Sequence, residues 1–292
     1  RNPCGFGACR HTTTRLNTLA TRLIVNADDY GLTEGVSEGI RRAHLDGILT
    51  TTTAMMNMPS VMADLKLGRE LCPNLGFGVH LVLTQGKPVR PPEKVPTLVR
   101  RDGRFYSVLQ IIEAVEGMNP VELRDEWRAQ IERFLETGIP IDHIDSHHHV
   151  VMRNEHTLRV ALDLASEYGV AIRNPFIRPE LESVASALLA QYGVLTTDRI
   201  ELTFYDSGAT RQRLLECIDN LQPDIVTELM CHPGYADAEL IRISAYHRPR
   251  ETELALLTDP EIKARIRERG IELVRFRDLA SVNRAASESP AG

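Results

Sequence analysis

Short apolar runs alternate with longer amphipathic segments along most of this 292-residue chain. The first run, residues 22–27, stops at two aspartates, as a buried parallel strand does where it leaves the core. The next segment, residues 35–46, places Val36, Ile40 and Ala43 on one helix face. The pattern then repeats to the end of the chain. Further strands are expected at residues 48–56, 77–83, 141–146, 170–173, 200–204, 224–230 and 271–274, and further helices at 60–71, 121–136, 156–168, 180–192, 210–220 and 259–269.

This alternation predicts a parallel sheet covered by helices. About eight strands suit a single-domain α/β fold of the (β/α) barrel type, either TIM-barrel-like or an irregular version of it. A doubly wound open sheet is the alternative. We expect the domain to cover residues 22–280, between a flexible extension at 1–21 and a flexible tail at 281–292. Residues 84–119 break the rhythm with several prolines, and a loop of this length is usually a lid or a specificity insert.

Composition and charge exclude several classes of partner. The formal net charge is −6 and aromatic residues make up 5% of the chain, so a nucleic-acid partner is not expected. No apolar run approaches the roughly 20 residues that span a bilayer, so no membrane association is expected either. Residues 1–20 lack the apolar core of a secretory signal. Five scattered cysteines indicate a reducing compartment, and we expect a cytoplasmic protein. Cys4 and Cys9 could supply two ligands to a metal site, but no second pair of cysteines follows them.

Four of the ten histidines lie in one window, residues 143–149. Strand alternation places His143, Asp145 and His147 on one side of the expected strand. His147, at the strand end, is the best-placed metal ligand, and Asp145 suits a partner that orients a ligand. The two histidines that follow should curve onto the rim of the sheet. The alternative is a solvated polyhistidine loop, which an apolar strand directly before it disfavours.

Other reactive side chains also follow expected strands. Asp28 and Asp29 end the first, His80 lies in the third, and His232 follows the seventh. Each has a structural alternative: a turn for the aspartates, a hydrogen-bonded core residue for His80, a cap or core residue for His232. Parallel barrels build their sites at the carboxyl ends of the strands, so we expect these side chains to meet. A carboxylate with two imidazoles suits a divalent cation. With a second carboxylate as base and a histidine as acid, this set predicts hydrolysis of an amide or ester.

Longer ordered motifs surround these residues. The chain resembles the YdjC-like carbohydrate deacetylases, most closely their chitooligosaccharide deacetylase branch. The resemblance covers about residues 22–280, and its matching stretches are residues 23–32, 78–88, 143–150 and 228–234, with a late region at 246–257.

The resemblance implies a role for each of five residues. Asp29, His80 and His147 would hold one divalent cation, Mg²⁺ or Zn²⁺, with Mn²⁺ or Co²⁺ as alternatives. Asp28 would be the catalytic base and His232 the general acid. The fold would be a (β/α) barrel and the protein a homodimer. The reaction would remove the N-acetyl group from an N-acetylglucosamine unit of a short chitooligosaccharide, and release acetate.

Three alternatives stay open from the sequence. The first is a deacetylase of a lipid-linked N-acetylglucosamine, as in hopanoid synthesis; residues 85–88 favour the soluble oligosaccharide. The second is a metal phosphoesterase, for which Arg173 and Arg178 would be the phosphate clamps, although both suit a surface or a sugar-binding role equally. The third is a non-catalytic sugar-binding protein, which the presence of all five site residues disfavours.

Overall fold

The computed structural model describes residues 20–282. The two predicted extensions, residues 1–21 and 281–292, therefore lie almost wholly outside the described residues, as do Cys4 and Cys9. Within the described range, no helix has both the length and the apolar character that crossing a membrane requires.

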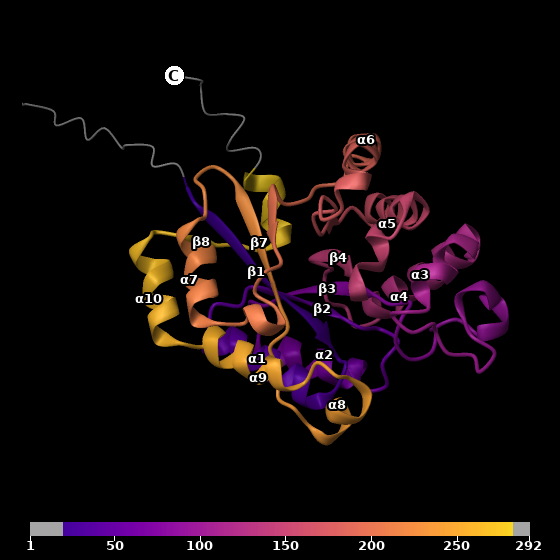
Figure 1. Ribbon diagram of the computed structural model, residues 1–292, viewed down its shortest axis with the longest axis horizontal. Helices are drawn as coiled ribbons and strands as arrows, with labels where there is room; N and C mark the ends of the chain where they lie inside the picture. The colour runs from indigo at the N-terminus through magenta and orange to yellow at the C-terminus, as the bar shows by residue number, and fades with distance from the viewer. Residues whose placement is uncertain (1–19, 283–292) are drawn as a thin grey trace, which may run out of the picture.

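The strands form one parallel sheet that curls into an open half-barrel (Figure 1). Seven strands follow the order β5-β4-β3-β2-β1-β7-β6, and β8 pairs with the start of β1. No pairing joins β5 to β6 in the described part of the chain, so the barrel is irregular and incomplete. The strands are β1 (Arg22–Tyr30), β2 (Thr51–Ala54), β3 (Gly76–Leu81), β4 (His143–Ser146), β5 (Ala171–Ile172), β6 (Arg199–Glu201), β7 (Val226–Cys231) and β8 (Glu272–Leu273). The predicted single-domain α/β fold of the irregular barrel type is confirmed.

Helices surround the sheet, with α7 and α10 on one side of the strands and α3 to α6 on the other (Figure 1). The helices are α1 (Glu34–Leu45), α2 (Val61–Leu71), α3 (Ile111–Ala114), α4 (Pro120–Leu135), α5 (Glu155–Tyr168), α6 (Glu182–Tyr192), α7 (Arg211–Asp219), α8 (Ala238–Ile243), α9 (Arg248–Leu257) and α10 (Pro260–Glu268). Three of them were not predicted. Helix α3 is a single turn inside the long loop, and α8 has only six residues. Helix α9 was missed because its buried face carries Arg250 and Glu253, which hide the apolar period.

The two ends of the half-barrel have different chemistry. At the amino ends of the strands, Ile24, Val226 and Phe276 belong to a small cluster of buried apolar residues. Phe276 also stacks on His143, the first residue of β4, with ring centroids 3.8 Å apart. His143 is therefore a core residue, far along the strand from His147. The carboxyl ends carry the polar side chains, which agrees with the place where parallel barrels build their sites.

Candidate metal centre

The backbone at the end of β1 turns two neighbouring carboxylates toward one cavity. On a regular strand adjacent side chains point to opposite faces. The register of β1 against β2 shifts between Ala27 and Tyr30, and Asp29 has a left-handed φ of 73°. As a result Asp28 and Asp29 both line the same cavity, although each is almost completely buried.

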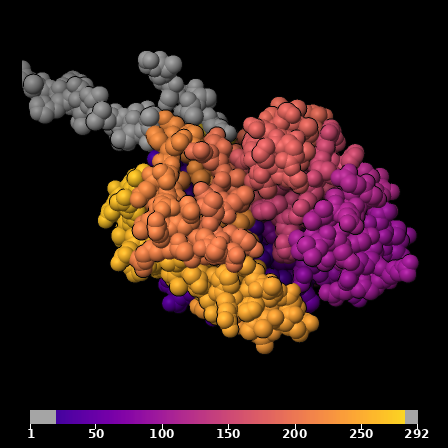
Figure 2. Space-filling model, viewed as in Figure 1, coloured from indigo at the N-terminus to yellow at the C-terminus, as the bar shows by residue number. Residues whose placement is uncertain are grey.

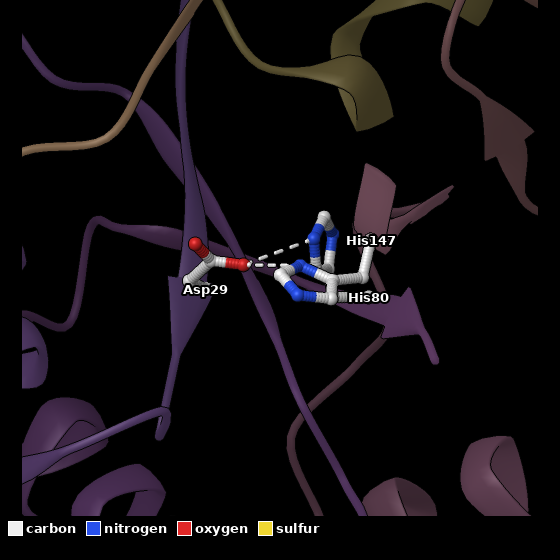
Figure 3. Close-up of side chains that lie close together, drawn as sticks. All are labelled: Asp29, His80 and His147. Atoms are coloured by element: carbon white, nitrogen blue, oxygen red, sulfur yellow. Dashed lines mark ion pairs between the residues drawn. The ribbon is translucent and has the colours of Figure 1, made fainter. Parts of the chain in front are cut away.

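Three side chains from separate segments of the chain converge there (Figure 3). Oδ1 of Asp29 lies 2.8 Å from Nδ1 of His147 and 3.2 Å from Nε2 of His80. Asp29 ends β1, His80 lies in β3, and His147 begins the 3-10 segment η4 (His147–Met152) directly after β4. The structure thus brings together the three residues that the sequence analysis proposed as ligands.

The geometry of this set fits a divalent cation. Within the described residues, the buried Oδ1 of Asp29 has no hydrogen-bond partner, although two imidazole nitrogens lie beside it. Ligand atoms about 2.0–2.2 Å from a metal ion lie roughly 3 Å from one another, as Oδ1 of Asp29 does from each imidazole nitrogen. Two imidazoles and a carboxylate form a mixed nitrogen and oxygen set, and the chemistry of the donors suits several divalent metals. We call Asp29, His80 and His147 the metal set.

Partners behind the metal set orient its members. Asp145 Oδ1 lies 2.6 Å from Nδ1 of His80, so that Nε2 of the ring faces Asp29. Burial alone would lower the pKa of His80, but the Asp145 carboxylate outweighs it and raises the pKa to about 10. A cation bound at Nε2 would therefore have to displace the proton of that nitrogen. Arg250 of α9 donates to Oδ2 of Asp29 at 2.5 Å. Burial works to raise the pKa of Asp29, but His147 and Arg250 hold it well below its usual range. The Asp29 carboxylate is therefore ionised and available to a cation.

A buried arginine holds Asp28. Arg173 is fully buried and donates to both oxygens of Asp28, at 2.6 and 2.7 Å. Its Nε donates to Glu228 at 2.8 Å, and its Nη2 lies 3.1 Å from Asp145. Asp28, His80 and Asp145 also lie close enough to one another to form a second potential cation site. The Arg173 guanidinium already supplies positive charge to two of its members, so we assign no metal there.

His232 completes the wall beside Asp28. Its Nε2 lies 3.8 Å from Oδ2 of Asp28. Burial lowers the pKa of His232 to about 4, against the attraction of Asp28 and Asp29, so the ring is neutral near pH 7. Glu253 of α9 accepts a hydrogen bond from the His232 backbone N–H, which fixes the loop after β7.

A close backbone contact supports the same loop. A Cβ added to Gly39 of α1 would lie 2.5 Å from the Cα of Gly234, so only glycine permits this approach. The contact seats the turn after His232 directly against α1.

The metal set lies at the bottom of a cavity of about 700 Å³. Figure 2 shows a hollow between the orange and yellow part of the chain and the magenta part. His148 and His149 also line the cavity, each with a left-handed φ near 50°. Burial lowers their pKa values to about 3 and about 4, respectively. Ser107 and Val108 of the long loop form part of the wall.

Several residues of this site were not found from the sequence. Arg173 was considered only as a phosphate clamp, a surface residue or a sugar ligand, and its complete burial rules out the surface role. Arg250 and Glu253 lie in the late matching region, residues 246–257, for which the sequence predicts no role. Glu228 was passed over, although a glutamate inside the apolar run of β7 was a usable signal, because a buried carboxylate requires a partner.

The sequence comparisons agree with this geometry. A profile of the family described as YdjC-like protein matches residues 22–268. The chain belongs to this family. A carbohydrate deacetylase of Thermoanaerobacter pseudethanolicus is 38% identical over 87% of this chain and 97% of its own length. A chitooligosaccharide deacetylase of Proteus mirabilis is 36% identical over 89% of this chain and 100% of its own.

A similar solved structure supports the fold. A crystal structure from Enterococcus faecalis V583, of a protein named for cellobiose-phosphate cleavage, is 38% identical to this chain. It superposes with a TM-score of 0.82 over 89% of this chain and 99% of its own length. The predicted resemblance to the YdjC-like family is thus confirmed.

Proposed function

We propose that this protein is a metal-dependent deacetylase of short chitooligosaccharides, which hydrolyses the N-acetyl group of an N-acetylglucosamine unit and releases acetate. The observation that carries the proposal is the convergence of the metal set in a cavity that also contains Asp28 and His232. The names of the relatives from T. pseudethanolicus and P. mirabilis support the same reaction and the same kind of substrate.

In this proposal Asp29, His80 and His147 hold one divalent cation. Zn²⁺ and Mg²⁺ both suit the set, with Mn²⁺ and Co²⁺ as alternatives. When bound, the cation supplies Lewis acidity toward the amide carbonyl and toward the attacking water.

Asp28 is the catalytic base in this proposal. Its Oδ2 accepts one hydrogen bond from Arg173 and keeps a second lone pair for the proton of the attacking water. The two-pronged contact with Arg173 prevents the carboxylate from rotating away. Asp28 can therefore take the proton without leaving the position in which it faces the cavity.

His232 returns that proton to the leaving amine. A neutral imidazole has to gain a proton before it can act as an acid. Oδ2 of Asp28 is 3.8 Å from Nε2, longer than a hydrogen bond, so the two groups have to approach each other before the proton passes between them. The proton then passes from water to Asp28, from Asp28 to His232, and from His232 to the nitrogen of the broken amide bond. The products are acetate and a free amino sugar.

The two arginines that the sequence offers as phosphate clamps for a phosphoesterase are each paired with carboxylates. Arg173 is engaged by Asp28 and Glu228, and Arg178 pairs with Glu180. Neither arginine lines the cavity that contains the metal set. A lipid-linked sugar is the next candidate if soluble sugars are not turned over.

The test is acetate release from N,N′-diacetylchitobiose by the purified protein. Activity should stop after chelation and return when Zn²⁺, Mn²⁺, Co²⁺ or Mg²⁺ is added back. Absence of release with every metal would overturn the assignment to soluble chitooligosaccharides.

A further inference from the structure

Two tyrosines form an aromatic wall at one side of the cavity. Tyr205 follows β6, and Tyr246 precedes α9. Their rings stack almost parallel, with centroids 4.5 Å apart and an interplanar angle of 10°. Tyr246 is half-buried, but Tyr205 remains 44% exposed. An exposed aromatic ring on a cavity wall is a candidate ligand contact.

This wall is held rigidly by polar contacts at its back. The Tyr246 hydroxyl donates to Glu253 and accepts a hydrogen bond from the backbone N–H of Asp206 at 2.9 Å. The Arg250 guanidinium lies 5.5 Å from the centre of the Tyr246 ring. These contacts tie the loop after β6 to α9. Tyr205 therefore offers a preset surface, and a ligand that packs on it loses little free energy in ordering the ring.

The wall adjoins the reaction centre without being part of it. The Tyr205 ring centroid lies 5.3 Å from that of His232, in an edge-to-face arrangement. Leu202 and Ile243 are apolar neighbours on the same cavity surface. The metal set, by contrast, is surrounded by charged side chains. The cavity therefore has a polar end for the reaction and an apolar, aromatic end beside it.

We infer that Tyr205 is the stacking surface for the sugar unit attached to the one that is deacetylated. This inference rests on the proposed function. In a β-linked N-acetylglucosamine unit the ring substituents are equatorial, so the sugar presents axial C–H groups to either side. The face of an aromatic ring carries the negative part of its quadrupole and attracts such groups. Tyr205 is then the residue that makes a disaccharide a better substrate than a monosaccharide.

The test compares Tyr205→Ala with wild type on N,N′-diacetylchitobiose and on N-acetylglucosamine. We expect the KM for the disaccharide to rise about 2- to 12-fold, the size of a lost aromatic contact. The kcat should change less than about twofold, because the contact is the same in ground and transition states. Tyr205→Phe keeps the ring face and should behave as wild type. Tyr235→Ala is the matched control, since Tyr235 is 38% exposed and does not line the cavity.

A binding measurement keeps the test independent of turnover. Calorimetric titration with the glucosamine disaccharide and with glucosamine should show that Tyr205→Ala weakens binding of the disaccharide alone. An equal loss for both sugars, or no loss for either, overturns the inference, provided that the thermal midpoint of the variant matches that of wild type. If wild type itself neither binds nor deacetylates the disaccharide, the proposed function fails. If wild type is active and Tyr205→Ala is equally active, only the inference about Tyr205 fails.

Discussion

Replacement of Arg173 by methionine tests the buried network beneath the cavity. The guanidinium makes two hydrogen bonds to Asp28 and one to Glu228, and it lies 3.1 Å from Asp145. Its removal leaves three buried carboxyl groups without their shared cation. Loss of one partner from a buried ion pair costs about 3–5 kcal/mol. At about 2–4 °C for each kcal/mol, the thermal midpoint should fall by roughly 6–20 °C.

The same change should lower activity, because Asp28 loses the contact that orients it. Loss of a residue that positions a catalytic group costs about 10- to 100-fold. The activity of Arg173→Lys should lie between those of wild type and Arg173→Met, since lysine keeps the charge but cannot contact both Asp28 oxygens in the same way. Acetate release and thermal unfolding followed by circular dichroism measure the two effects.

Arg178→Met is the control for Arg173→Met. Arg178 is about one third exposed and pairs with Glu180 at the surface, where an ion pair contributes about 0–1 kcal/mol. Its thermal midpoint should therefore stay within about 4 °C of wild type. If Arg173→Met were as stable as Arg178→Met, the description of Arg173 as the shared counterion of three buried carboxylates would be refuted.

Three further changes test other parts of the site. Asp28→Asn should lower turnover about 10²- to 10⁴-fold while metal content by plasma emission stays unchanged, because base and ligand are separate residues; loss of metal would show that their roles overlap. His147→Ala should lower metal content, and unchanged occupancy would point to His148 or His149 as the ligand. Burial raises the pKa of Glu253 from 4.5 to about 7, against its hydrogen bonds from Tyr246 and the His232 N–H. Between about pH 4.5 and 7 the Glu253 carboxyl is therefore protonated in the folded state and ionised in the unfolded state. Its contribution to the free energy of unfolding falls as the pH rises through this range, by up to ~3 kcal/mol. Urea unfolding at several pH values measures this dependence, and Glu253→Gln should remove it. If the free energy of unfolding of Glu253→Gln varies with pH in parallel with that of wild type, the prediction is wrong.

Local pattern was enough to predict the sheet and the chemistry at its edge. The apolar run before Asp28 and Asp29 predicted a buried strand, and such strands place their last residues at one rim. His147 and His232 follow runs of the same kind. The sequence therefore indicated which rim carries the reactive side chains. It did not indicate α9, because Arg250 and Glu253 occupy its buried face and conceal the helical period.

Tertiary structure alone decided how those side chains are held. Arg173 is 145 residues from Asp28, and Arg250 is 221 residues from Asp29, so no local pattern could connect either pair. The open seam between β5 and β6 depends on strand pairing over similar distances. The left-handed backbone at Asp29 gave no signal either, because only a small fraction of aspartates adopt a positive φ. Strand propensity and polarity are properties of neighbouring residues, whereas the pairing of buried charges is a property of the folded chain.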